Sequence, residues 1–132
     1  MTLYVDSSAL LKRYIDEHDS EAARGLMSAD DVLLTSRLTE VEVRRNLSRL
    51  LAGSALETAR RQFAVDLDSF ALVALDATCC NEAARIAEQT LCRSLDALHL
   101  AAALRAGRAT VLTFDLRQAQ VARNLGLGVV GC

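Results

Sequence analysis

The chain alternates between short apolar runs and longer segments in which apolar residues recur every three or four positions. A continuous short apolar run is typical of a strand buried on both faces, and the longer spacing is typical of an amphipathic helix. We expect strands at 3–5, 32–35, 70–75, 109–114 and 127–130. We expect helices at 9–15, in a segment ending near 29, from 36 to a stop at 53, from 54 onward, from 76 or 78 to 91, at 95–106 and at 116–125.

Strands that alternate with helices in this way predict an α/β fold with right-handed crossovers. We expect three layers, in which a central parallel sheet of four to five strands has helices on both faces. A length of 132 residues suits a single domain, spanning 1–132. The hydrophobic content of 52% allows a full core without disulfides or metal.

Local signals refine the helix ends. Ser54-Ala55-Leu56-Glu57 has the capping-box pattern, which predicts that a helix begins at Ser54. The chain contains no proline, so Ser, Thr, Asp and Gly mark the ends of helices instead.

Composition narrows the class of protein. There is no apolar run of about 18 residues, so no transmembrane span is expected, and the start of the chain lacks a basic-then-apolar leader. The four cysteines form no C-x-x-C pair, which favours reduced thiols in a cytoplasmic protein over a zinc site. A net charge of −2 argues against a surface covered in phosphate-neutralising charge, but it permits a local basic rim around an acidic site.

Acidic residues follow two of the predicted strands. Asp6 comes directly after the first strand, and Asp115 directly after the fourth. The carboxyl ends of parallel strands are where open α/β sheets bind their ligands. Asp is also a leading N-cap residue, so each of these acids has an ordinary role in starting the next helix.

Two further positions place carboxylates near the same edge. Asp96 lies in the first turn of the helix at 95–106, where the helix macrodipole favours any acid. Glu40 and Glu42 lie early in the helix after the second strand. A helical wheel places Glu40 within the apolar stripe and Glu42 beside Leu38, and an ordinary surface pairing of Glu42 with Arg45 is available. The residues alone do not separate the two glutamates.

The joint pattern favours a metal site. Four unpaired carboxylates close together would repel one another and raise one another's pKa. A hard divalent cation removes that conflict, and oxygen ligands select Mg²⁺ or Mn²⁺. His99, one helical turn after Asp96, is either a partner of this site or, as its apolar neighbours favour, a packed core histidine.

The motifs in order resemble a known family. Val-Asp6-Ser-Ser-Ala-Leu, Ser36-Arg-Leu-Thr-Glu-Val-Glu42, Leu-Asp96-Ala-Leu-His-Leu-Ala and Thr113-Phe-Asp115 are similar to the PIN domain and, more narrowly, to the VapC toxins of bacterial toxin–antitoxin pairs. The resemblance covers nearly the whole chain. It matches the four family acids to Asp6, Glu42, Asp96 and Asp115, leaving Glu40 as a neighbour, and it matches Ser8 and Thr113 to the hydroxyl positions. Ser7 stands where the family commonly has threonine.

The resemblance implies a function. It implies a Mg²⁺-dependent endoribonuclease that leaves a 5′-phosphate, a homodimer, and a VapB-like antitoxin whose tail occupies the acidic cleft, often with an arginine in place of the metal. Asp6, Asp96 and Asp115 would hold the ion. The alternatives are a PIN nuclease that is not a toxin, an inactive PIN fold that only binds a partner, and a receiver-like phosphoacceptor module. The last usually has paired acids after strand one and a lysine at strand five, whereas here a single acid follows Val5 and 127–131 has no lysine.

Overall fold

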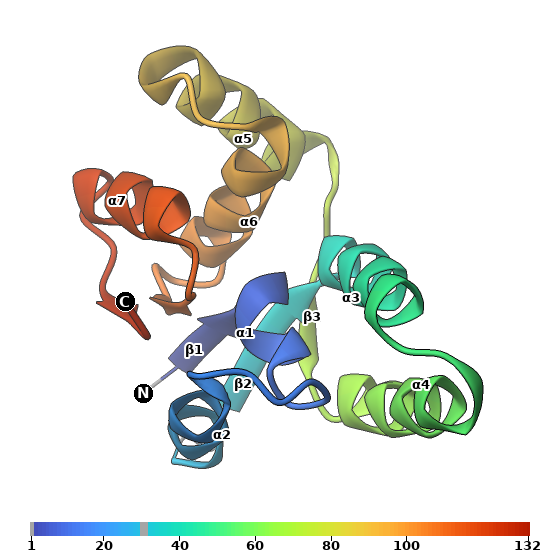
Figure 1. The fold of residues 1–132 in the computed structure, drawn as a ribbon. Helices are drawn as coiled ribbons and strands as arrows, with labels where there is room; N and C mark the ends of the chain where they lie inside the picture. The colour runs from blue at the N-terminus through green and yellow to red at the C-terminus, as the bar shows by residue number, and fades with distance from the viewer. Residues whose placement is uncertain (1, 30–31) are drawn as a thin grey trace.

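The computed structural model describes residues 2–29 and 32–132 and contains a five-stranded sheet in the order β3-β2-β1-β4-β5 (Figure 1). The strands are β1 (Thr2–Val5), β2 (Val32–Ser36), β3 (Ala71–Val73), β4 (Thr110–Leu112) and β5 (Val129–Val130). The helices are α1 (Ser7–Leu11), α2 (Ser20–Ser28), α3 (Arg37–Leu50), α4 (Gly53–Asp68), α5 (Ala77–Thr90), α6 (Ser94–Arg105) and α7 (Leu116–Asn124). All strand pairs are parallel, as the alternating pattern predicts.

The central strand is β1. Its residue Leu3 pairs with Leu33 of β2 on one side and with Thr110 of β4 on the other. The chain first builds the sheet outward through β2 and β3, and then returns past β1 to place β4 and β5 on the opposite side. The order of strands therefore reverses between β1 and β4, and such a switch point leaves an open crevice at the carboxyl ends of the strands.

Helices cover both faces, which confirms the three predicted layers. Successive residues of β1 point to opposite faces because the side-chain period of a strand is two. Leu3 and Val5 pack in a core with apolar residues of α1, α2, α3 and α4, whereas Tyr4 packs with residues of α5, α6 and α7. Figure 1 shows the same division, with α5, α6 and α7 on one side of the sheet and the earlier helices on the other.

Several helix ends differ from the predictions. The helix expected from 36 to a stop at 53 ends at Leu50, and Gly53 is instead the first residue of α4. The first helix spans Ser7–Leu11 rather than 9–15, because the backbone N–H groups of Lys12 and Arg13 bond three residues back and tighten the last turn. The capping box is wrong, because α4 begins at Gly53 after Ala52 and has no side-chain cap. The positive φ of Gly53 (58°) turns the chain one residue early, which leaves Ser54 inside the first turn.

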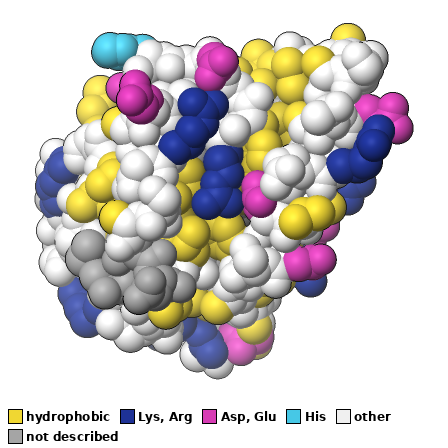
Figure 2. Space-filling model, turned by 90° about the horizontal axis from the view of Figure 1, so that it is seen from below, with side chains coloured by type: hydrophobic (Ala, Val, Ile, Leu, Met, Phe, Trp, Pro, Cys, Tyr) yellow, Lys and Arg dark blue, Asp and Glu magenta, His cyan; other side chains and the backbone are white. Residues whose placement is uncertain are grey.

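Charges are dispersed over the face of the molecule that is drawn in Figure 2. Figure 2 shows basic and acidic side chains interspersed with apolar ones on one face, with no continuous basic area, in keeping with the net charge of −2. Within 2–29 and 32–132, no helix combines the length and apolar character needed to cross a membrane. The four cysteines, all in the described part of the chain, are free thiols.

Candidate active site

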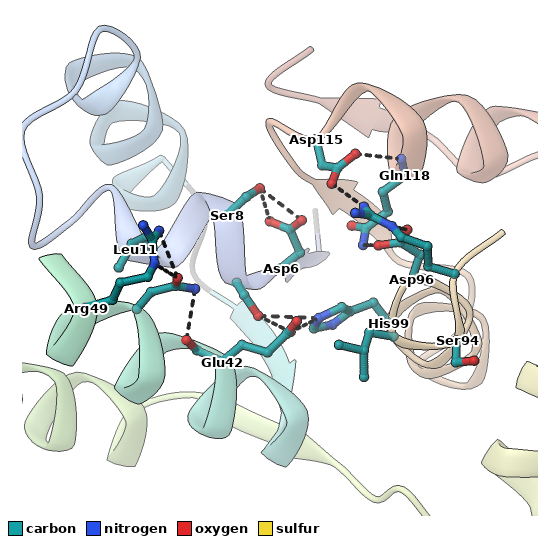
Figure 3. A pocket seen from close by; sticks show the side chains of 14 residues that line it. Asp6, Ser8, Leu11, Glu42, Arg49, Ser94, Asp96, His99, Asp115 and Gln118 are labelled. Carbon is teal, nitrogen blue, oxygen red and sulfur yellow. Dashed lines mark hydrogen bonds and ion pairs between the residues drawn. The ribbon is translucent and has the colours of Figure 1, made fainter.

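A cavity of about 390 Å³ opens at the switch point between β1 and β4 (Figure 3). Its lining brings together the four predicted acids, Asp6, Glu42, Asp96 and Asp115, with Ser8 and His99. These residues come from the end of β1, from α1, α3 and α6, and from the end of β4. Segments far apart in the sequence therefore deliver side chains to one hollow.

Asp6 is buried at the end of β1, with 2% of its surface exposed. It caps α1 by accepting a hydrogen bond from the backbone N–H of Ala9 at 2.9 Å, so its ordinary role as an N-cap is confirmed. The hydroxyls of Ser8 (2.8 Å) and Thr113 (2.6 Å) also donate to its carboxylate. Burial raises the pKa of Asp6, and the charge of His99 and these hydrogen bonds oppose the shift only in part.

The same two hydroxyls join the ends of β1 and β4. The Ser8 hydroxyl accepts from the backbone N–H of Phe114 at 3.0 Å, and the Thr113 hydroxyl accepts from the N–H of Asp115 at 3.1 Å. Each hydroxyl thus donates to Asp6 and accepts from the segment that carries Asp115. Ser8 and Thr113 therefore fix the position of Asp6 relative to the last acid, although Thr113 itself does not line the cavity.

Glu42 is bound to a buried histidine. Its Oε1 lies 2.6 Å from Nε2 of His99 and accepts a second hydrogen bond from the Ser7 hydroxyl. Nε2 acts as the donor, because a carboxylate only accepts. Partial burial opposes ionisation of Glu42, but the hydrogen bond and charge of His99 and the Ser7 hydroxyl outweigh it, so the pKa of Glu42 is lowered.

A buried chain of polar groups supports this histidine. Nδ1 of His99 lies 2.8 Å from the hydroxyl of Tyr4, which lies 2.9 Å from the hydroxyl of Ser36. Because these contacts use both ring nitrogens, the ring is held in one orientation. His99 is thus buried, as its apolar neighbours indicate, yet its Nε2 faces a cavity carboxylate (Figure 3).

Glu40 lies outside the cavity. Its carboxylate pairs with Arg37 at 2.9 Å and with Arg44 at 3.8 Å on the surface of α3. The structure therefore separates the two glutamates that the residues alone left open, with Glu42 facing the cavity and Glu40 in a surface ion-pair cluster.

Asp96 and Asp115 share one arginine. The guanidinium of Arg93 donates from Nε to Asp96 at 2.8 Å and from Nη2 to Asp115 at 2.7 Å. Asp115 also caps α7 by accepting from the backbone N–H groups of Arg117 and Gln118. Burial works against ionisation of Asp115, but these N–H donors and Arg93 outweigh it and hold the pKa of Asp115 below its ordinary value.

This arginine corrects one expectation. The four carboxylates are not unpaired, since Arg93 forms ion pairs with two of them and His99 is hydrogen-bonded to a third in the described structure. In this arrangement, no three acidic, His or Cys side chains of the described residues converge on a common point that would hold an ion. The sequence contains the local part of the signal, because Arg93 and Asp96 are three residues apart on one helix face.

Gln118 was missed from the sequence. It is 2% exposed, its Nε2 donates to Asp96 at 3.3 Å, and its backbone N–H donates to Asp115. Its Oε1 is buried without a hydrogen-bond partner among the described residues. An acceptor left unpaired beside two carboxylates suits a hydrated cation, whose water would supply the missing donor. The oxygen-only donors Asp6, Asp96 and Asp115 fit Mg²⁺ or Mn²⁺ chemically, provided that Arg93 moves away.

Comparison with known proteins places the chain. The PIN domain family model matches residues 3–124. The ribonuclease VapC46 of Mycobacterium tuberculosis (strain ATCC 25618 / H37Rv) is 33% identical over 130 residues, covering 97% of this chain and 95% of the relative. The ribonuclease VapC35 of the same strain is 36% identical over 134 residues, with the same two coverages.

Solved structures share the fold. FitAcB from Neisseria gonorrhoeae matches with a TM-score of 0.77 at 17% identity, covering 98% of this chain and 96% of that one. VapC20 of Mycobacterium tuberculosis, described as a sarcin–ricin loop cleaving toxin, matches with a TM-score of 0.75 at 18% identity, covering 89% and 93%. The extent of the family match and the two relatives above 30% identity lead to one conclusion: this chain belongs to the PIN domain family and, within it, to the VapC group.

Proposed function

We propose that this protein is a metal-dependent endoribonuclease that hydrolyses RNA phosphodiester bonds as the toxin of a type II toxin–antitoxin pair. The observation that carries the proposal is the cavity in which Asp6, Glu42, Asp96 and Asp115 meet from separate elements. Its relatives VapC46 and VapC35 are named ribonucleases, which supports the same reaction class.

Each acid has a distinct place in this proposal. Asp6, Asp96 and Asp115 would hold Mg²⁺, or Mn²⁺ in its place, because their carboxylate oxygens are the ligands these ions prefer. The bound ion would lower the pKa of a water molecule and stabilise charge on the scissile phosphate.

Glu42 would accept a proton from the attacking water. Its lowered pKa keeps it ionised at neutral pH, and the donors Ser7 and His99 hold its Oε1 and leave the other oxygen, Oε2, free of them. Ser8 and Thr113 would keep Asp6 in register with the end of β4. His99 would act through Glu42, as a positioning residue.

The structural neighbours also support a protein partner for this chain. Structural neighbours include VapBC2 from Rickettsia felis bound to a promoter DNA fragment and FitAB bound to a DNA fragment, which are complexes of paired proteins. By analogy, we propose a VapB-like antitoxin, a homodimeric toxin and a cytoplasmic location. Growth arrest on expression, relieved by the product of a neighbouring short reading frame, would support the toxin role. Robust RNase activity without growth arrest would favour a PIN nuclease of another kind.

The central experiment tests cleavage in purified protein. Labelled RNA should be cut in the presence of Mg²⁺ or Mn²⁺ and left intact with EDTA. Asp6→Asn should lower the rate by at least about 100-fold, because loss of even an indirect partner of a metal ligand commonly costs 10- to 100-fold. Asn keeps the shape of the side chain and its ability to cap α1.

The matched control is Asp16→Asn, which removes a carboxylate paired with Arg24 on the surface. This variant should retain full activity. Full RNase activity in a folded Asp6→Asn protein would refute the assignment of the site.

A further inference from the structure

Arg93 occupies an unusual position in the cavity. It is the N-cap residue of α6, and its guanidinium bridges Asp96 of the same helix and Asp115, which follows β4. The side chain of Arg93 is 57% exposed, whereas that of Asp96 is 10% exposed. An exposed cation is therefore paired with two less exposed anions.

The bridge uses the oxygens that a metal would need. Arg93 takes Oδ2 of Asp96 and Oδ2 of Asp115. One positive charge against two carboxylates leaves a net charge of −1, whereas a divalent cation in place of the guanidinium would leave no net charge. Ion pairs with an exposed partner are individually weak, so displacing the guanidinium from these carboxylates costs little free energy.

The released side chain would remain at the mouth of the cavity, because its backbone is held at the start of α6. A guanidinium presents a planar fork of donors that matches phosphate oxygens, and it cannot lose its charge at neutral pH. A free Arg93 would therefore face the backbone of an RNA strand lying across the acids.

We propose that Arg93 is an exchangeable counter-ion: it holds Asp96 and Asp115 together in the metal-free protein, competes with the divalent cation for them, and binds an RNA phosphate once displaced. This inference rests on the proposed function for its RNA half. The competition half stands on the geometry of the bridge and can be tested without RNA.

The first test measures Mn²⁺ binding by calorimetry. Arg93→Gln should bind Mn²⁺ about fivefold more tightly than the wild type, the factor that corresponds to losing one partly exposed ion pair. Arg93→Lys keeps the charge without the fork and should fall between the two. Thermal melts in EDTA should show Arg93→Gln less stable than the wild type, with the difference shrinking when Mn²⁺ is added.

The matched control is Arg105→Gln at the other end of α6. Arg105 also pairs with an aspartate, Asp76, at 3.2 Å, but it does not line the cavity. Its loss changes the net charge equally and should leave the affinity for Mn²⁺ unchanged. Equal or weaker Mn²⁺ binding by both Arg93→Gln and Arg93→Lys would overturn the competition.

The second test separates metal from RNA. For Arg93→Gln, the Mg²⁺ concentration at half-maximal activity should fall while KM for RNA rises several-fold at saturating Mg²⁺. An unchanged KM would overturn the phosphate role. If the wild type cuts no RNA but Arg93→Gln still binds Mn²⁺ more tightly, the proposed function and the phosphate role fail while the competition stands. If the wild type cuts RNA but Arg93→Gln binds Mn²⁺ with unaltered affinity, the proposed function stands and the competition fails.

Discussion

On one side of the cavity, hydroxyl and imidazole groups hold Asp6 and Glu42, whereas on the other side Asp96 and Asp115 share the guanidinium of Arg93. We call these the hydrogen-bonded side and the arginine-held side. Both contain two carboxylates, but only the second contains an arginine, which pairs with both of them. None of the ion pairs in the described structure involves Asp6.

The two sides differ in the direction in which the pKa of an aspartate is shifted. Burial raises the pKa of Asp6, which lies among neutral hydroxyl donors, whereas backbone N–H groups and Arg93 overcome burial and lower the pKa of Asp115. An ionised Asp6 is therefore under-compensated and attracts a new cation. The arginine-held side already holds one cation, Arg93, which must leave before another can bind. Two aspartates of one cavity thus have pKa values that are shifted in opposite directions.

The largest expected effect concerns the hydrogen-bonded side. Glu42→Gln should lower the cleavage rate by about 100-fold or more, because a positioned general base contributes on that order. Glu40→Gln is the matched variant on the same helix, and it should stay within about twofold, since Glu40 only pairs with surface arginines. The measurement is the rate of RNA cleavage at saturating Mg²⁺. Equal losses of activity in the two variants would contradict the assignment of the catalytic role to Glu42 rather than Glu40.

A smaller effect should follow from the support of Glu42. His99→Leu removes the Nε2 donor and should reduce kcat by about tenfold with little change in KM, as for other groups that orient an active-site residue. His99→Gln should restore part of the loss, because its amide N–H can also donate to Glu42. Tyr4→Phe should act in the same direction more weakly, by freeing Nδ1. If His99 were only a core residue, Leu and Gln variants of equal stability would show equal kcat.

The smallest expected effect is on the stability of the metal-free protein, and it tests the difference between the two sides directly. Asp6→Asn should raise the free energy of unfolding of the metal-free protein at neutral pH, on the order of 1 kcal/mol, because it removes a buried, under-compensated charge. A raised folded-state pKa means that stability falls as pH rises from the ordinary value of 3.8 to that raised value. The gain in Asp6→Asn should therefore vanish below about pH 4, where the wild-type group is protonated in both states.

Asp115→Asn should do the opposite. The lowered pKa of Asp115 means that its ionised form stabilises the fold above its ordinary pKa, and that this stabilisation is lost as pH falls through the lowered value. The variant should therefore be less stable than the wild type at neutral pH and converge with it in strong acid. Thermal melts in EDTA across this pH range measure the stability of both variants relative to the wild type. If Asp6→Asn and Asp115→Asn changed stability in the same direction, the distinction between the two sides would be lost.

Much of the fold was predictable because its signals are local. The apolar run ending at Val5 predicts a buried strand and the acid that follows is an N-cap residue, and the structure confirms both, although α1 begins at Ser7 rather than at 9. The same holds for Asp115 and α7. The capping box failed because a backbone feature, the positive φ of Gly53, began α4 before Ser54.

The candidate site was predictable only in outline. Strand-end acids share an edge in any parallel sheet, so Asp6 and Asp115 could be grouped from the sequence. The choice between Glu40 and Glu42 depends on which side of α3 faces the cavity, and the helical wheel did not decide it. The contact of His99 with Glu42 spans 57 residues and was equally out of reach.

By itself, the sequence determined the succession of strands and helices along the chain and the residue types available to the cavity. Side-chain periodicity and capping act over a few neighbouring residues, so they can be read locally. Only the tertiary structure decided which charges meet there. Arg93 reaches Asp96 within one helix turn, but its bond to Asp115 crosses 22 residues and exists because the chain returns past β1 to form β4. The ionisation of each acid then follows from the burial and donors that this crossover brings to it.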